Sequence, residues 1–423
     1  MRATSYLLFG AGQLGVMMLA RFFFQWVLDF AGTPTAAGVP LFAAASVGLL
    51  FFAFRIFDGV TDPLAGLLGD GWVRRGRERR SLLFVAFALP SIGLVLVFSP
   101  SEALGEAARW GLLAAGMFVF FVGYTLYAIP YWSLLDDYAA GDEARRARLS
   151  SVLGGGVLGA TALGFVLSPW LVERLGFLGA AAVFAAPAAG LMLLPYVARP
   201  DDARAPAPSP PGPGLVATLR EALAHRRFVS VVVLFAGGQM SFTVMTAAAP
   251  FFAVDLLGGE TSDVALLLGP FLLTAIPTFL VLPRLSRRLG WERAVLGATL
   301  ALGAVYGGAG LLGADLIGGP VVTAALLFAM GGPMAAVLLG LEGEAIVASA
   351  AERDGEVTSL YFGAFNFVVK GLNGLALYLT GILAGLARGG EPLAVRAMGG
   401  LAGGLLVVGV IAYVALRPAR VRR

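Results

Sequence analysis

The sequence predicts an all-α polytopic membrane protein, with twelve transmembrane helices in two pseudo-symmetric six-helix bundles. Of its 423 residues, 58% are hydrophobic and 13% are charged, and the charged fraction is about half that of a typical soluble domain. The mean hydropathy is +0.85. Twelve mainly apolar runs each approach the roughly 20 residues that a bilayer-spanning helix needs. A proline-rich stretch separates the sixth run from the seventh.

The twelve runs define the order of the expected helices. Their centres lie near residues 17, 53, 90, 121, 161, 187, 240, 273, 303, 329, 370 and 404. The stretch 205–213 is rich in Pro, Ala and Ser, which favours an extended, solvated linker. We therefore expect an N-terminal bundle over residues 1–198, a linker over 199–226 and a C-terminal bundle over 227–423. This plan is typical of transporters built from two related halves.

The basic residues between the spans predict the orientation of the chain. Loops taken alternately from the N-terminus hold 23 arginines in one set and four in the other. Because cytoplasmic loops carry the excess of Lys and Arg, both termini and the linker are expected in the cytoplasm. We expect a multi-pass protein of the cell (inner) membrane that acts as a monomer.

The composition excludes several chemistries. The chain has no cysteine and a single histidine, His225, so disulfides, thiolate metal sites and imidazole relays are excluded. We expect no metal site and no cofactor. The arginines flank apolar runs and lack interleaved aromatic residues, so topology explains the basic pI better than a nucleic-acid partner does.

Three charged residues lie within the second apolar run. Arg55, Asp58 and Asp62 are spaced i, i+3, i+7, which places them on one helix face. Pro63 follows directly, removes a backbone hydrogen bond and invites a bend beside the acids. Ionisable groups at membrane depth are costly and usually face a cavity or a partner. A cation site is the favoured interpretation, because one arginine does not neutralise two acids; a purely structural Arg55–Asp58 pair is the alternative.

Lys370 is the only lysine in the chain and lies in the middle of the eleventh run. A rise of about 1.5 Å per residue places it roughly 20 Å into the membrane, at a depth comparable to that of Asp58 and Asp62. We expect this compact ammonium to approach the acids and balance their charge. A lysine that extends toward one membrane surface is the alternative.

A loop motif follows the second run. Gly66 and Asp70 precede a basic cluster that begins with Arg74 and Arg75. This pattern resembles the loop motif of the major facilitator superfamily, in which the acid and the arginines pin neighbouring helix ends in one conformation. An ordinary cytoplasmic basic cluster is the alternative, but it does not explain an acid at Asp70.

The span motifs together resemble the glycoside–pentoside–hexuronide:cation symporter family, the melibiose permease-like family. The segment 55–63 is similar to its helix II, 124–134 to its helix IV, 146–151 to the following loop and 369–371 to its helix XI. The resemblance implies the major facilitator fold and coupled transport of a solute with H⁺, Na⁺ or Li⁺.

The resemblance also implies roles for individual residues. In that family two helix II acids bind the cation, and they correspond to Asp58 and Asp62. The threonine that completes the cation site corresponds to Thr125, and a lysine tied to that site corresponds to Lys370. An aromatic residue of the sugar pocket corresponds to Trp132.

The chain departs from the family where the sugar binds. Gln13, Ala128 and a position near Leu153 stand where the family has an acid, an acid and an arginine. A site built to bind hydroxyl groups loses heavily when its polar partners are absent. The cation end is therefore retained and much of the sugar end is lost. This leaves open an amphipathic solute, as in the related lysolipid symporters, beside a sugar held by neutral amides.

Several polar and aromatic residues are candidates for the solute pocket; any amide among them can instead join helices. The substrate-binding candidates are Gln13, Arg21, Tyr124, Trp132, Gln239 and Asn366. Gln25 and Asn373 are further polar groups of the same kind, and Tyr131 and Phe365 are expected to add aromatic walls.

The leading hypothesis is a secondary active transporter, coupled to H⁺ or Na⁺, that moves a small organic solute by alternating access. A sugar or glycoside ranks first, and a lysolipid or other amphipathic solute second. An intramembrane aspartyl hydrolase needs two carboxyls on facing elements that share a proton, which two acids one turn apart on one helix do not provide. We therefore do not expect an enzyme. A non-transporting sensor on the same fold is a third alternative, which an uptake assay separates.

Overall fold

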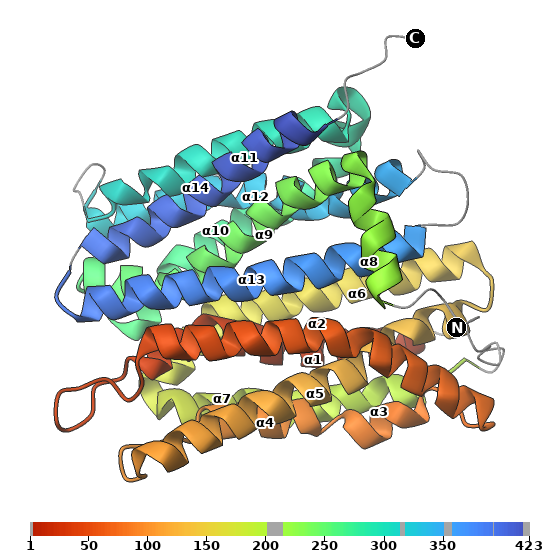
Figure 1. The fold of residues 1–423 in the computed structure, drawn as a ribbon, viewed down its shortest axis with the longest axis horizontal. Coiled ribbons are helices and arrows are strands. Elements are labelled where there is room, and N and C mark those ends of the chain that lie inside the picture. The colour runs from red at the N-terminus through yellow and green to blue at the C-terminus, as the bar shows by residue number, and fades with distance from the viewer. Residues whose placement is uncertain (1–2, 201–214, 314–317, 351–357, 392, 418–423) are drawn as a thin grey trace. The chain divides into compact units, whose positions relative to one another are not determined.

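The computed structural model describes residues 3–200, 215–313, 318–350, 358–391 and 393–417. Throughout these residues the chain is almost entirely helical (Figure 1), and an isolated bridge between Pro34 and Pro40 is their only β-structure. The contacts divide the chain into two units, Met1–Leu41 with Val60–Gly212 and Phe42–Gly59 with Pro213–Arg423. Helix α2, Ala44–Arg74, contributes to both units. The domain boundaries expected from the sequence stay a prediction.

The first unit contains α1 and the helices up to α7, with the second part of α2. Their bounds are α1 Ala3–Ala31, α3 Ser81–Ala86, α4 Leu89–Val97, α5 Glu106–Ala139, α6 Glu143–Ala162, the π-helix η1 Leu163–Leu167 and α7 Ser168–Val197.

The second unit contains the first part of α2 and the helices from α8 onward. Their bounds are α8 Leu215–Ala224, α9 Arg226–Phe251, η2 Phe252–Leu256, η3 Thr261–Asp263, α10 Val264–Leu289, α11 Trp291–Gly307, η4 Gly308–Leu311, α12 Pro320–Ala350, α13 Thr358–Arg388 and α14 Leu393–Leu416. Helix α8 lies in the expected linker, whose proline-rich part, 205–213, lies outside the described residues.

Each of the twelve expected spans lies in a helix. Nine segments of the described chain are long and apolar enough to cross a membrane. One of them, Glu143–Val197, has 55 residues, or about 80 Å of helix, against a hydrocarbon core of about 30 Å. Gly176 breaks it with a φ of 68°, so it holds the fifth and sixth spans. The third span is Ser81–Val97, and the ninth is α11 with 17 residues.

Aromatic side chains form the core of the first unit. Phe22 of α1 packs edge-on against Phe98 at a centroid distance of 5.2 Å, and Phe23 packs against Phe120 of α5 at 4.6 Å. Helices α4 and α5 approach closely at Gly93, where a Cβ atom would lie 2.3 Å from the backbone nitrogen of Phe120. Only glycine fits such a crossing, so this position fixes how the two helices pack.

Close helix pairs also build the second unit. Helix α10 packs against α12, and α9 packs against α14. At the first contact, a Cβ atom on Gly332 would lie 2.1 Å from the carbonyl oxygen of Phe271. At the second, a Cβ atom on Gly237 would lie 2.6 Å from the carbonyl oxygen of Leu405. Small residues at helix contacts are typical of membrane proteins, because packing rather than hydrophobic burial joins helices in lipid.

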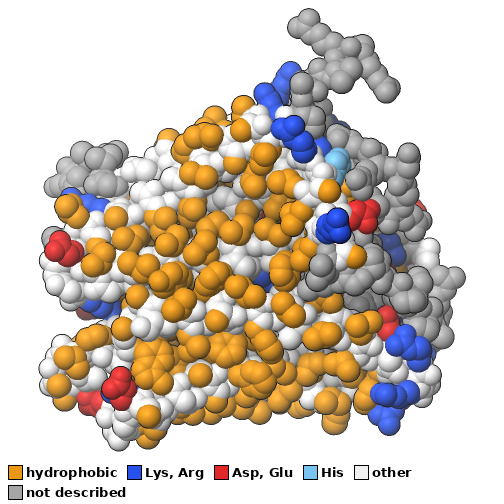
Figure 2. Space-filling model, viewed as in Figure 1, with side chains coloured by type: hydrophobic (Ala, Val, Ile, Leu, Met, Phe, Trp, Pro, Cys, Tyr) orange, Lys and Arg blue, Asp and Glu red, His pale blue; other side chains and the backbone are white. Residues whose placement is uncertain are grey.

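The surface has the distribution that a bilayer requires. Figure 2 shows hydrophobic side chains along the helices and charged side chains gathered near the helix ends. Large apolar residues such as Leu273 and Leu280 of α10 are 70% and 75% exposed. In a soluble protein a continuous apolar surface of this kind is rare, whereas lipid covers it in a membrane.

Candidate functional site

Asp58 is the most deeply buried of the acids on α2. Its side chain has no exposed surface, and its Oδ2 atom lies 2.6 Å from Arg55 Nη1 and 3.0 Å from Lys370 Nζ. All three residues belong to the second unit. A buried carboxylate is stable only when it is paired and hydrogen-bonded, and here a guanidinium and an ammonium converge on one oxygen.

Glycines bring α2 and α13 together around this cluster. A Cβ atom on Gly374, one turn after Lys370, would lie 2.8 Å from Arg55 Cβ. Likewise, a Cβ atom on Gly59 would lie 3.0 Å from the ring of Phe367. The absence of side chains at these positions lets the two helices approach, and the approach places the ammonium of α13 against the acid of α2.

Asp62 lies one turn after Asp58 on α2, within the first unit. The hydroxyl of Thr125 on α5 donates to Asp62 Oδ1 over 3.4 Å, near the outer limit of a hydrogen bond. Thr125 is 2% exposed, whereas Asp62 is only partly buried. The helix itself fixes the spacing of the two acids at about 6 Å along its axis.

Two positive groups face one acid around Asp58. Arg55 and Lys370 both contact its carboxylate within the second unit. The contact with Lys370 agrees with the approach expected from the depth of this lysine in the eleventh run. A cation that bound Asp58 Oδ2 would have to replace at least one of two donors that already contact it.

Two candidate solute residues of the first unit contact each other. The indole Nε1 of Trp132 on α5 donates to Gln13 Oε1 on α1 over 2.8 Å. Arg21, two turns further along α1, interacts electrostatically with Tyr124. The amide of Gln25 is fully buried, and neither of its polar atoms has a hydrogen-bond partner among the described residues. Helix α1 therefore carries three polar groups at membrane depth.

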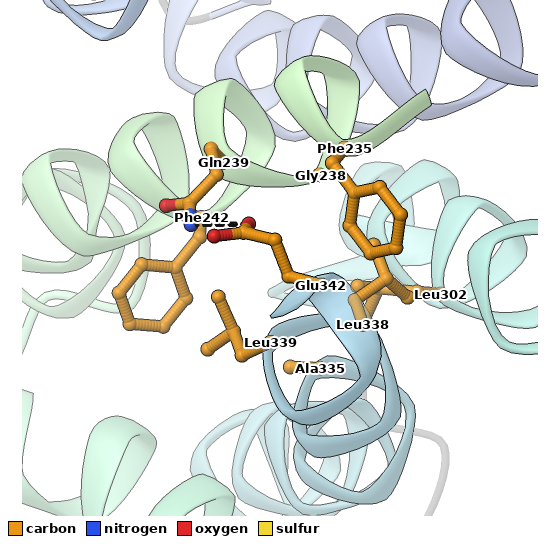
Figure 3. A pocket seen from close by; sticks show the side chains of 9 residues that line it. All are labelled: Phe235, Gly238, Gln239, Phe242, Leu302, Ala335, Leu338, Leu339 and Glu342. Atoms are coloured by element: carbon orange, nitrogen blue, oxygen red, sulfur yellow. Dashed lines mark hydrogen bonds between the residues drawn. The ribbon is translucent and has the colours of Figure 1, made fainter. Parts of the chain in front are cut away.

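The other pocket candidates have different surroundings. Gln239 on α9 donates from Nε2 to Glu342 Oε2 on α12 over 2.9 Å (Figure 3). Asn366 on α13 is exposed. Tyr131 and Phe365, expected as aromatic walls, are buried within their units at 0% and 1% exposure, and Tyr131 donates its hydroxyl to the carbonyl of Phe9.

The loop motif after α2 forms an ion-pair network within the first unit. Asp70 Oδ1 lies 3.3 Å from Arg79 Nη2, and Arg79 Nη1 lies 3.2 Å from Asp137 Oδ2 at the end of α5. Arg79 is 8% exposed, whereas Arg74 and Arg75, which we expected in this role, are both exposed. Among the described residues, no atom lies within 4 Å of a Cβ built on Gly66, so close packing there does not explain this glycine.

Comparison with known proteins decides the family. Residues 6–411 match the MFS/sugar transport protein family, which is the melibiose permease-like family. The chain belongs to this family. It is therefore a multi-pass membrane transporter and not an enzyme, and the resemblance found in the span motifs is confirmed.

A protein with a similar sequence is also named as a transporter. A segment of 172 residues is 30% identical to an uncharacterized symporter of Synechocystis sp.. The match spans 39% of this chain and 30% of the length of that protein. Together with the family match, it supports a secondary transporter.

Solved transporters share the fold of this MFS/sugar transport family member. The POT family transporter PepTSo has a TM-score of 0.72 at 12% identity, with 98% of each chain covered. A bacterial homologue of the human lysosomal transporter Spinster has a TM-score of 0.69 at 15% identity over 99% of each chain. A mutant of the nucleoside transporter NupG has a TM-score of 0.65 at 14% identity, covering 97% of this chain and all of the other. These identities show the fold alone, and the expected fold class is confirmed.

Sequence reasoning missed Glu342, Arg79 and Asp137. Glu342 lies within the apolar helix α12, and the criterion that identified Asp58, an ionisable residue inside an apolar run, also applies to it. Its place at the margin of the tenth run, which is centred near residue 329, weakens this signal. Arg79 and Asp137 are adjacent to motif residues, but only the folded chain brings them together.

Proposed function

We propose that the protein is a secondary active transporter coupled to H⁺ or Na⁺, which moves a small organic solute by alternating access. Asp58 and Asp62 bind the cation, Thr125 assists at Asp62, and Lys370 and Arg55 balance the charge. The proposal rests above all on the contact of Lys370 Nζ with Asp58 Oδ2 at 3.0 Å.

This contact supports coupling because Lys370 and a cation would compete for the carboxylate of Asp58. The ammonium and a monovalent cation need the same carboxylate oxygen, and both cannot neutralise it at once. When the cation binds, Lys370 is displaced; when the cation leaves, Lys370 returns and the buried acid keeps a positive partner. Lysine suits this exchange, since its charge is compact and its stem flexible.

A sugar or glycoside ranks first as the solute, on the description of the family. A lysolipid or other amphipathic solute is the second candidate, and a specific observation favours it. The polar pair on α1 and α5 is the neutral Gln13–Trp132 contact, and Ala128 is a fully buried apolar residue. Fewer charged groups than in a sugar pocket favour a less polar solute.

We also propose that both termini face the cytoplasm of the cell and that the protein acts as a monomer in the inner membrane. The distribution of arginines between alternate loops supports this orientation. Asp70, Arg79 and Asp137 then form a cytoplasmic latch between the ends of α2 and α5, in which Arg74 and Arg75 contribute surface charge.

Uptake into proteoliposomes tests the function. A panel of hexoses, pentoses, glycosides and lysolipids would be offered under an imposed Na⁺ gradient and, separately, an imposed pH gradient. We expect one solute class to accumulate with the wild type. The Asp58→Asn/Asp62→Asn variant should lose accumulation, with Asp136→Asn, an exposed acid of α5, as the matched control. Full accumulation by the double variant would refute the proposed coupling.

A further inference from the structure

Glu342 lies within the apolar helix α12 of the second unit and takes no part in the site described above. Its Oε2 atom accepts a hydrogen bond of 2.9 Å from Gln239 Nε2. No lysine or arginine of the described chain lies within 4.0 Å of its carboxyl group, in contrast to Asp58. Figure 3 shows the carboxyl directed toward α9 and the amide directed back at it.

The surroundings of this pair are apolar. The other seven residues that line the small cavity beside it are Phe, Leu, Ala and Gly, among them Phe235, Phe242 and Leu302. Helices α9 and α12 meet here because a Cβ atom on Gly238 would lie 2.4 Å from Leu338 Cδ2. An ionised carboxylate in such a place, with one neutral amide as partner, is costly. A proton on Glu342 removes that cost and leaves the hydrogen bond with Gln239 in place.

The charged groups of the neighbouring helices are engaged elsewhere or exposed. On α13, Lys370 contacts Asp58, and Arg388 lies 4.0 Å from Asp255. On α11, Glu292 contacts Arg417 and Arg227, the latter from the start of α9.

The remaining charged groups lie near the helix ends. Arg226 of α9, Arg284, Arg287 and Arg288 of α10, and Arg293 of α11 are exposed. On α12 itself, Glu344 is exposed and accepts from Ser286. Glu342 is therefore the titratable group that the cavity presents.

The size of the cavity limits what can bind. Its volume is about 10 Å³, which is at the lower limit for a single water molecule. A hard metal cation takes about six oxygen ligands, and an organic solute needs a far larger space. A proton delivered by one water molecule is the ligand that fits.

We propose that Glu342, held by Gln239, is a proton-binding site of the second unit, separate from Asp58 and Asp62. The carboxylate takes a proton from water to form the neutral acid and returns it to water, with no other bond made or broken. This proposal goes beyond the function proposed above, because it needs neither the cation site nor a solute.

Infrared spectroscopy of the whole purified protein tests the proposal with H⁺ as the only ligand. A neutral carboxylic acid has a C=O stretching band that a carboxylate lacks. In a pH titration without Na⁺ or solute, the wild type should show one such band that disappears reversibly as the pH rises. Glu342→Gln, a variant of the same shape, should lose the intensity of one carboxyl group per chain. Glu344→Gln, two residues away and exposed, should keep the band.

A second variant tests the role of Gln239. Gln239→Leu removes the amide donor, so the band should shift to higher wavenumber without disappearing. A spectrum of Glu342→Gln identical to that of the wild type at every pH would overturn the proposal. So would a Glu342 band that never titrates while the protein stays folded, because that acid would not exchange its proton. The same band retained in Asp58→Asn/Asp62→Asn keeps this result independent of the proposed cation site.

Discussion

At the scale of single residues, the ion pair between Lys370 and Asp58 explains the use of one lysine in a chain of arginines. A guanidinium is planar and forms fixed forks of hydrogen bonds, whereas an ammonium is a point charge on a flexible stem. Arg55 lies one turn from Asp58 on the same helix and can hold the acid at all times. Lys370 comes from α13, so its contact can be broken without unwinding α2.

Replacement of Lys370 should therefore change the response of the protein to the cation while the protein still folds. We expect Lys370→Ala to lower the melting temperature of the cation-free protein, because Asp58 loses one positive partner, and to enlarge the stabilisation by the coupling cation, because its competitor is gone. Lys370→Arg should restore the melting temperature of the cation-free protein in part. The measurement is the melting temperature of the pure protein as Na⁺ replaces choline and as pH varies. Arg388→Ala, a basic residue at the end of the same helix, should respond as the wild type does; a normal response in Lys370→Ala would contradict this role.

Helix periodicity predicts the positions of the site residues but not their partners. The depth and spacing of Asp58, Asp62 and Lys370 follow from helix periodicity, which is local. The partners Arg79 of Asp70 and Glu342 of Gln239 come from other parts of the chain, and periodicity does not say which faces meet. The exposure of Asn366 and the burial of Tyr131 are likewise set by tertiary packing.

At the scale of helices, the contact of α2 with α13 depends on glycine. Gly374 lies against Arg55, whereas no atom of the described part of the chain lies within 4 Å of the Cβ position of Gly371 on the same helix. The sequence does not distinguish these two glycines, but only Gly374 packs against another described helix. Helix boundaries show the same limit, since α8 forms in a stretch expected as linker.

Two alanine variants of α13 should therefore change the stability of the protein in opposite directions. Gly374→Ala should lower the stability by about 1–3 kcal/mol, because the methyl group overlaps Arg55 in a packed contact. Gly371→Ala should raise it by up to about 1 kcal/mol, since alanine favours a helix where nothing is hindered. Thermal or denaturant unfolding in detergent measures both, and equal effects would contradict the assigned contact.

At the scale of the whole molecule, the twelve expected spans and the family follow from hydropathy and from a few motifs. Hydropathy predicts spans well because lipid forces every backbone group into internal hydrogen bonds. The third and ninth spans have the shortest helices. The third, Ser81–Val97, is divided into two helices, and the ninth, α11, has 17 residues. What hydropathy cannot supply is the solute, since that depends on side chains from several helices.

The proposed orientation is testable because the chain has no native cysteine. Ala37→Cys, in the exposed loop before α2, should react with a membrane-impermeant maleimide added to intact cells. Ala144→Cys, exposed at the start of α6, should react only after the membrane is opened. The reverse pattern would place the termini outside the cytoplasm.

We propose that Asp58 and Asp62 bind the coupling cation, and the cation-dependent stability of the pure protein tests this binding. Ligand binding to the folded state alone raises stability, by about 2.7 kcal/mol at a hundred times Kd. We predict a saturable rise in melting temperature with Na⁺ at constant ionic strength or, for H⁺ coupling, with falling pH. Asp62→Asn and Asp58→Asn should lose this response, and Asp136→Asn should keep it. An undiminished response in both site variants would show that neither acid binds the cation.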